Sequence, residues 1–166
     1  CCFINTILNA AAYAVVSYQT AYLKYYYPVE FMAALLTSVI DNSGKVAEYI
    51  YSCRQMGIQI LPPDINKSVG TFSVENGNIR FGLTAIKSVG RPVIQAIIEE
   101  RNERGEFKHL KDFIERMGGR EVNKRTIENF IKAGVFDSLG GTRKQFMMIY
   151  IPVSYTHLTL PTTPYV

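Results

Sequence analysis

The sequence predicts a mainly α-helical protein with one small β-hairpin. Apolar residues recur every three to four positions over most of the 166 residues, which is the period of amphipathic helices. One Asn-Gly pair separates two short alternating runs, and this is the strongest local signal for a tight hairpin. The 48% hydrophobic content is enough for a core, in one domain or in two small ones that share an interface.

Three helices are expected in the first third of the chain, over residues 10–26, 28–39 and 45–56. The first should end before Pro28, because the residue before a proline avoids the helical region and proline itself suits a first helical turn. The capping residues Asp41-Asn42-Ser43 precede the third helix and mark its start.

A different pattern begins at Ile58, where an alternating run is broken by two prolines. The β-hairpin is expected from residues 71–74 and 79–81, which lie on either side of Asn76-Gly77. After Gly82 the pattern is helical again, over residues 91–104, 109–116, 124–132 and 142–150.

The last stretch has neither a helical nor a strand pattern. Residues 145–166 contain no Asp, Glu, Lys or Arg, and from Pro152 on they are mostly Thr, Pro, Tyr and Leu. We therefore expect residues 151–166 to be a non-native tail, similar to translated adaptor DNA, that packs poorly. A genuine flexible tail is the alternative.

Composition excludes several classes of protein. No apolar run approaches the roughly 20 residues that a membrane-spanning helix needs, and the N-terminus lacks a signal-peptide pattern. Three cysteines and two histidines suit neither a disulfide framework nor a zinc set, so we expect no metal site and a reducing cytoplasm.

The net charge of +4 is unevenly distributed along the chain. Residues 1–79 carry a net charge of −1, and residues 80–166 carry +5. A basic second half is what a phosphate-binding region requires, although alternating charges on solvated helix faces would look similar.

Residues 83–100 are the most informative segment. A short apolar turn leads into Lys87-Ser88-Val89-Gly90, and a helix then opens with Arg91 and Pro92. Gly90 is expected to free the backbone at the bend, so that backbone N–H groups point outward beside two cations and suit a phosphate. This is the outline of a helix-hairpin-helix, a module that grips nucleic-acid backbone without reading bases. An ordinary helix and turn with solvated charges explains the same residues equally well.

Several segments, in one order, resemble the family of bacterial replicative DNA polymerase III alpha subunits. Residues 11–24 and 27–34 resemble its fingers, residues 60–66 its passage out of the fingers, and residues 81–90 and 130–140 its two helix-hairpin-helix motifs. The resemblance covers roughly residues 10–150, and several motifs in one order make it specific.

The resemblance implies that the chain is a fragment with three parts. Residues 1–57 would be the C-terminal part of the fingers, with residues 1–9 non-native and poorly packed. Residues 58–150 would be a β-hairpin plus a tandem helix-hairpin-helix domain that binds DNA, and residues 151–166 the non-native tail. The expected fold is therefore mainly α, with a helical fingers segment, a small β-hairpin and a tandem helix-hairpin-helix domain.

Two departures from the family pattern matter. The family usually has a Phe-Asn-Lys-Ser-His stretch before the fingers motif, whereas residues 3–9 contain neither Lys nor His, as a frameshift would explain. The nucleotide contacts of that stretch therefore cannot be assigned to any residue here. At Ser88 the family more often has glycine, and a left-handed conformation there would cost serine more.

No residues for polymerase chemistry are recognisable. There is no Asp-x-Asp motif, and Glu99, Glu100 and Glu103 alternate with arginines as on a solvated helix face. The resemblance implies that the catalytic aspartates and the Mg²⁺ of the parent polymerase lie upstream. We expect no catalytic residue, metal or cofactor in the fragment, which should be inactive alone although its parent is a DNA-directed DNA polymerase.

The two hairpins would hold DNA through backbone N–H groups and nearby cations. The predicted DNA-binding residues are Lys87, Ser88, Val89, Gly90, Arg91, Lys124, Arg125, Lys132, Gly134 and Val135. For Gly134 the alternative is a plain helix C-cap. The tyrosines of residues 13–27 could stack on bases but are expected to pack in a core, and Lys24 is expected to reach solvent rather than a nucleotide.

The implied partners are the backbone of a primer-template DNA duplex, the rest of the polymerase III alpha chain and the replisome, in the bacterial cytoplasm and without a membrane. Two alternatives remain open. One is a stand-alone, non-specific helix-hairpin-helix DNA-binding module, and the other is an interaction domain whose hairpins only pack helices.

Overall fold

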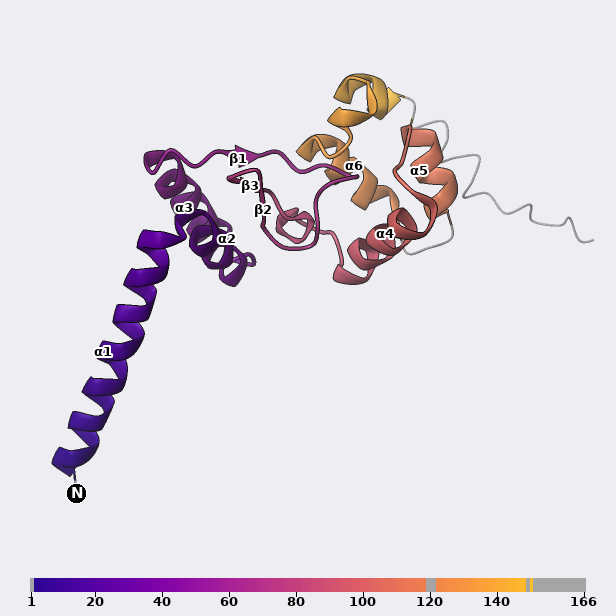
Figure 1. Cartoon of the computed structure of the whole chain (residues 1–166). Helices are drawn as coiled ribbons and strands as arrows, with labels where there is room; N and C mark the ends of the chain where they lie inside the picture. Colours follow the sequence, from indigo (N-terminus) through magenta and orange to yellow (C-terminus); the bar gives the residue numbers. More distant parts are fainter. Residues whose placement is uncertain (1, 119–121, 149, 151–166) are drawn as a thin grey trace, which may run out of the picture.

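The computed structural model describes residues 2–118, 122–148 and 150, with side chains from residue 10 onward. The predicted tail and the packing of residues 1–9 lie outside this part. The mainly α fold with a small sheet is confirmed (Figure 1). In chain order the elements are α1 (Cys2–Tyr26), α2 (Pro28–Ser38), α3 (Ser43–Gln55), β1 (Ile60–Leu61), β2 (Ser73–Glu75), β3 (Asn78–Arg80), the 3₁₀ turn η1 (Leu83–Ala85), α4 (Arg91–Arg104), α5 (Leu110–Met117), α6 (Lys124–Ala133) and the 3₁₀ turn η2 (Asp137–Leu139); residues 143–148 are also helical.

Helix α1 projects from the rest of the molecule as a rod (Figure 1). All its side chains from residue 10 on are exposed, Lys24 included, and Tyr18 is 71% accessible. The tyrosines contact mainly each other along the helix, as Tyr22 and Tyr26 do with ring centroids 4.5 Å apart. The expected packing of these tyrosines in a core is therefore absent from the described part of this chain, where no other segment covers them.

Helices α2 and α3 form as the sequence predicts. Pro28 opens α2, and the side chain of Asn42 accepts a hydrogen bond from the Lys45 N–H at 3.1 Å to cap α3. Their buried faces pack against the β-hairpin in one apolar cluster, formed by Met32, Ala33, Leu36, Val46, Cys53, Ile58, Phe72 and Ile79. The hairpin thus shares its core with residues before position 58.

The sheet has the strand order β1-β3-β2. Strands β2 and β3 form the predicted antiparallel hairpin, with Glu75 opposite Asn78. Asn76 (φ 50°) and Gly77 (φ 75°) both have positive φ, as a tight two-residue turn requires. The parallel pairing of β1 with β3, which places Ile60 opposite Ile79, was not foreseen, because it joins segments that are distant in sequence.

A second apolar cluster lies between α4, α5 and α6. Its centre is a chain of edge-to-face phenylalanine contacts, in which Phe113 lies 5.2 Å from Phe107 and 5.1 Å from Phe136, measured between ring centroids. Such contacts stabilise a core beyond the burial of the ring surface. This cluster fixes the helices on which the predicted DNA-binding residues stand.

Candidate nucleic-acid interface

The first hairpin joins η1 to α4 through residues 86–90. Its first limb is one 3₁₀ turn rather than the short helix that a helix-hairpin-helix outline suggests. The expectation that Gly90 provides the backbone freedom is wrong. Gly90 has an ordinary extended conformation (φ −72°, ψ 144°), whereas Ser88 is left-handed at φ 62°. The bend therefore occurs two residues earlier than predicted. Because Ser88 carries a Cβ, its left-handed conformation costs more free energy than it would at a glycine.

The backbone N–H groups of Val89 and Gly90 have no acceptor within the described part of the chain. Gly90 is the N-cap of α4, and its carbonyl accepts the Ile94 N–H at 3.3 Å. Helix α4 has Pro92 in its first turn, a position where the missing N–H costs nothing. Because free N–H groups at a helix start carry partial positive charge, this end of α4 suits an anion.

Two predicted cations, Lys87 and Arg91, are exposed beside these N–H groups. Arg91 also forms an ion pair with Asp41, with Nη2 and Oδ2 3.7 Å apart, across a groove of about 520 Å³ between the hairpin and the start of α3. Both side chains are largely exposed, so the pair is weak. Ser88 is exposed and Val89 half-buried on the same stretch.

The second hairpin is different, because its amides are already used. The Gly134 N–H donates to the Ile131 carbonyl at 3.1 Å, and the Val135 N–H donates to the Phe130 carbonyl at 3.0 Å. Gly134 has a left-handed φ of 83° and ends α6 as a C-cap, and Val135 is fully buried. The helix C-cap that the sequence left open for Gly134 is therefore what the structure contains, and neither amide has a hydrogen to offer a phosphate.

Arg143 closes the second hairpin, a role that sequence reasoning missed. Its Nη2 lies 2.7 Å from Oδ2 of Asp137, and its Nη1 donates to the Lys132 carbonyl at 3.3 Å. The hydrogen bond with Asp137 raises the pKa of Arg143 above its ordinary value. The sequence hints at this pair only by placing Asp137 three residues before Gly140 and Arg143 three residues after it.

The predicted cations of α6 are exposed at its two ends, with Lys124 and Arg125 in the first turn and Lys132 in the last. The middle of α6 contacts the first hairpin, because Asn129 Nδ2 donates to the Lys87 carbonyl at 3.0 Å. The structure therefore brings α6 beside the first hairpin through Asn129, which the sequence could not indicate because it lies 42 positions after Lys87.

Glu100 does not lie on a solvated helix face, as the charge pattern suggested. It is fully buried, and its Oε1 accepts a hydrogen bond from Arg116 Nε at 3.1 Å and pairs with Arg104 Nε at 3.4 Å. Arg116 also lies over the Phe107 ring at 4.3 Å. The correction follows from the helical period, since Glu100 is three residues after the buried Ile97 and shares its inner face.

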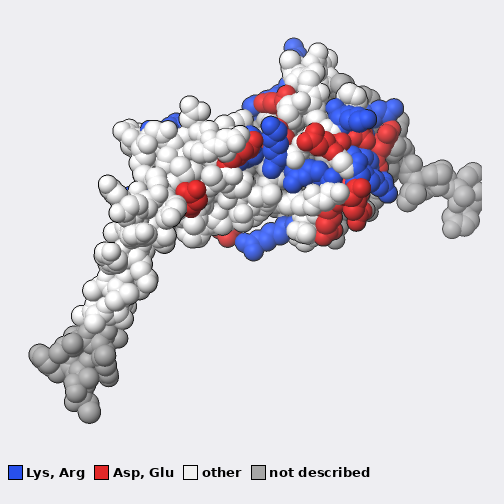
Figure 2. All heavy atoms as spheres, in the orientation of Figure 1, with Lys and Arg blue, Asp and Glu red and all other residues white. Residues whose placement is uncertain are grey.

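Charged side chains gather over the half of the molecule that holds α4 to α6, while α1 is nearly bare of charge in the same view (Figure 2). Among the described residues, no three His, Cys, Asp or Glu side chains are placed to hold a metal ion, so these residues do not fit a Mg²⁺ centre. Within the same part of the chain, no helix combines the length and apolar character that crossing a membrane requires.

Comparison with known proteins identifies this region. Residues 57–146 match the family model described as "Helix-hairpin-helix motif". The DNA polymerase III subunit alpha of Thermus aquaticus is 52% identical over 132 residues, which cover 80% of this chain and 11% of that protein. The corresponding subunit of Campylobacter jejuni is 50% identical over 140 residues, covering 82% of this chain and 12% of that protein.

A third relative has a lower sequence identity over a similar length. The DNA polymerase III subunit alpha of Mycobacterium tuberculosis is 44% identical over 142 residues, which cover 86% of this chain and 12% of that protein. This chain thus spans only 11 to 12% of the length of these relatives. The predicted resemblance to this group of subunits is confirmed.

Proposed function

The chain belongs to the helix-hairpin-helix motif family, and from this premise we propose that it holds duplex DNA by its sugar-phosphate backbone within a DNA polymerase III alpha-type protein. The observation that carries the proposal is the first hairpin. Its Val89 and Gly90 N–H groups have no acceptor within the described residues, and exposed Lys87 and Arg91 stand beside them.

The DNA binding that this geometry supports is independent of base sequence. Backbone N–H groups and cations reach phosphate oxygens, which are the same at every nucleotide. Each phosphate that a cation neutralises releases counterions, so the affinity should fall steeply with salt. Lys132 and the cations at the start of α6 extend the positive surface, since Asn129 ties α6 to the hairpin.

In this proposal the chain positions DNA and does not catalyse its synthesis. The described residues include no carboxylate cluster that fits Mg²⁺, and polymerase chemistry needs metal ions to activate the primer hydroxyl. We therefore expect the chain alone to be inactive in a primer-extension assay with Mg²⁺. Extension by chain freed of contaminating polymerases would contradict this point.

The proposal includes the setting of the chain. Residues 1–57 would belong to the polymerase fingers, with residues 1–9 non-native, and residues 58–150 to the DNA-binding part, followed by a non-native tail at 151–166. The rest of the alpha chain and the replisome, in the bacterial cytoplasm, would be the partners. The match outside the helix-hairpin-helix region favours this setting over a stand-alone binding module, because a free-standing binder has no need of a fingers segment.

Salt-dependent DNA binding tests the proposed function. Fluorescence anisotropy with two duplexes of unrelated sequence should give equal affinities and a log–log salt slope of about −0.9 per phosphate neutralised. The double variant Lys87→Gln/Arg91→Gln should reduce that slope by about 1 to 2 and change both duplexes equally. The matched control Lys24→Gln/Arg54→Gln removes two exposed cations of α1 and α3 and should bind like the parent. If the hairpin variant binds like the parent at every salt concentration, the hairpin is structural.

A further inference from the structure

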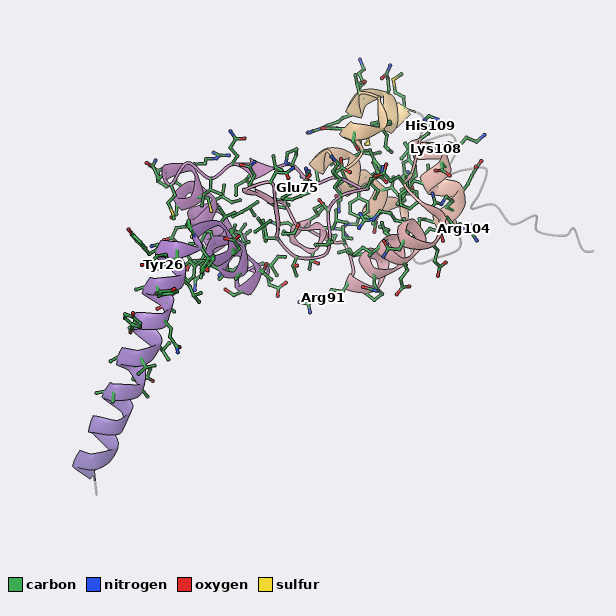
Figure 3. All side chains as sticks on the ribbon, viewed as in Figure 1. Tyr26, Glu75, Arg91, Arg104, Lys108 and His109 are labelled. Atoms are coloured by element: carbon green, nitrogen blue, oxygen red, sulfur yellow. The ribbon has the colours of Figure 1, made fainter. Side chains whose placement is uncertain are left out.

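A carboxylate lies directly beside the arginine of the first hairpin. Asp41 Oδ2 is 3.7 Å from Nη2 of Arg91, the first residue of α4. Asp41 belongs to the turn between α2 and α3, so the pair joins two segments that are distant in sequence. Figure 3 shows the side chain of Arg91 extending outward from the start of α4. Asp41 therefore faces a cation that the proposed function assigns to DNA phosphates.

The backbone on each side of this pair is held in place. On the Asp41 side, the Asn42 N–H donates to the Val39 carbonyl at 2.8 Å, and the Asn42 side chain caps α3. On the other side, Arg91 begins a helix whose inner face is buried. Both residues line the groove of about 520 Å³ between α3 and the hairpin. The two side chains therefore meet across this groove because the folded helices place them there.

The two apolar clusters are joined by other contacts than this pair. Phe81 packs against both clusters. Its N–H donates to the Leu61 carbonyl at 3.1 Å, and its carbonyl accepts the Ser68 hydroxyl at 2.9 Å. The side chains of Arg91 and Asp41, by contrast, are 77% and 82% exposed. Because an ion pair in water contributes little to stability, a structural role does not account for the placement of Asp41.

The geometry leaves Arg91 able to change partners. Its nitrogen and the Asp41 oxygen are 3.7 Å apart, whereas an N–H···O hydrogen bond spans about 2.7 to 3.2 Å. The pair of Arg143 and Asp137 is closer, with Nη2 and Oδ2 2.7 Å apart. The guanidinium of Arg91 therefore keeps its N–H donors for another acceptor, while the charge of Asp41 still attracts it.

We infer that Asp41 is an internal competitor of DNA for Arg91; the inference rests on the proposed function of the first hairpin. In the free chain the Asp41 carboxylate faces the guanidinium, and on binding a phosphate oxygen takes its place. The phosphate wins this exchange because the N–H groups of Val89 and Gly90, which have no acceptor among the described residues, bind it as well.

The exchange lowers the affinity of the hairpin for DNA in two ways. Binding first has to break the attraction between Asp41 and Arg91, and it then leaves the Asp41 charge close to a phosphate of the same sign. An exposed ion pair of this kind corresponds to a factor of about 1.5 to 5 in an equilibrium constant. Removing the Asp41 charge should therefore raise the affinity for DNA, whereas a structural role of the pair predicts a less stable chain and no gain in affinity.

A double-mutant cycle on the full chain tests the inference. Binding of duplex DNA is measured by fluorescence anisotropy for the parent, Asp41→Asn, Arg91→Gln and the variant with both changes, which isolates the coupling between the two side chains. Glu48→Gln is the matched control, because Glu48 is an exposed acid of α3 that does not line the groove. Urea unfolding of the same variants reports whether each one keeps the stability of the parent.

We expect Asp41→Asn to bind DNA about 1.5- to 5-fold more tightly than the parent at low salt, with the gain shrinking as salt is added. In the Arg91→Gln background, the same change should raise the affinity no more than the Glu48→Gln control does. An equal gain in both backgrounds, or no gain beyond the control, overturns the inference. A loss of stability in Asp41→Asn without a gain in affinity overturns it as well, in favour of a structural pair.

Failure of the proposed function would give a different result. If Lys87→Gln/Arg91→Gln binds DNA like the parent, the hairpin does not hold phosphates, whatever the result for Asp41→Asn. If that double variant loses affinity while Asp41→Asn shows no gain, the hairpin binds DNA and Asp41 does not compete for it.

Discussion

At the scale of single residues, Ser88 has a backbone conformation that shapes the proposed phosphate-binding loop and lowers the stability of the fold. It holds a left-handed φ of 62° in the middle of the proposed phosphate-binding loop. A side chain in this region costs about 1 to 2 kcal/mol relative to glycine, because Cβ approaches the following carbonyl. This conformation turns the chain so that the N–H groups of Val89 and Gly90 meet no acceptor among the described residues.

Ser88→Gly should therefore stabilise the chain by about 1 kcal/mol in urea unfolding, with DNA affinity kept. The matched change Ser52→Gly, in the middle of α3, should destabilise it by about 0.5 to 1 kcal/mol, because glycine weakens a helix interior. Equal shifts in the same direction for both variants would show that Ser88 is not strained.

The two hairpin glycines should respond in opposite ways to alanine. Gly134 has a φ of 83°, and a Cβ there would meet Asp137 Oδ2 at 2.7 Å and the guanidinium of Arg143. At Gly90 the nearest atom to a new Cβ is Pro92 Cδ at 3.6 Å, which is ordinary contact. We predict that Gly134→Ala lowers the free energy of unfolding by about 1 to 3 kcal/mol and Gly90→Ala by less than about 0.5 kcal/mol. A large decrease in the free energy of unfolding for Gly90→Ala would indicate that the bend occurs at Gly90 rather than at Ser88.

At the scale of elements, the junction of α4 and α5 depends on a buried ion pair. Arg116 bonds the Glu100 carboxylate and also donates to the Glu100 and Gly105 carbonyls at 2.9 and 3.0 Å. This network fixes the connection between α4 and α5. The Arg116 side chain thus contacts the Glu100 carboxylate, two backbone carbonyls and the face of the Phe107 ring.

Arg116→Met should destabilise the chain by about 3 to 5 kcal/mol, because it removes one half of the buried Arg116–Glu100 ion pair together with the hydrogen bonds of Arg116 to the Glu100 and Gly105 carbonyls. Lys111→Met removes a side chain that is 75% exposed and pairs with Glu115 at 3.6 Å, and it should change stability by less than about 1 kcal/mol. Urea unfolding of the two variants measures the difference. Equal, small effects would mean that the Glu100 site is open to solvent.

The elements themselves could be predicted where the signal is local. The helices from Arg91 to Arg104 and from Lys124 to Ala133, and the turn at Asn76-Gly77, follow from period, caps and turn chemistry. What could not be predicted depends on contacts between distant segments. The pairing of β1 with β3, the burial of Glu100 and the link from Asn129 to Lys87 leave no local pattern.

In the candidate site, too, local features could be predicted from the sequence, whereas features that depend on distant segments could not. The sequence located the first hairpin and its cations, because small residues and two charges beside a proline are a local pattern. It placed the bend at Gly90 rather than Ser88, because glycine is the usual left-handed residue. It could not show which hairpin keeps free amides, since that depends on where each helix ends.

At the scale of the whole molecule, α1 stands apart from both cores. Its described side chains are exposed, and its tyrosines contact mainly one another. Among the described residues α1 contacts α2 but buries none of its side chains, so packing adds little to its own helix propensity. We expect its amides to exchange with deuterium far faster than those of α4, whose inner face is buried among Val93, Ile94 and Ile97. Equal protection of α1 and α4 by mass spectrometry would mean that α1 is covered in solution, as by a second copy.

The central claim is that free backbone N–H groups of the first hairpin hold DNA phosphates. Amide NMR of the nitrogen-labelled chain, titrated with a short duplex, tests it most directly. We predict the largest shift changes at Val89 and Gly90, reversed by added salt, and little change at Gly134 and Val135, whose N–H groups donate within the chain. DNA-induced shifts that leave Val89 and Gly90 in place, or that centre on Gly134 and Val135, would contradict the claim.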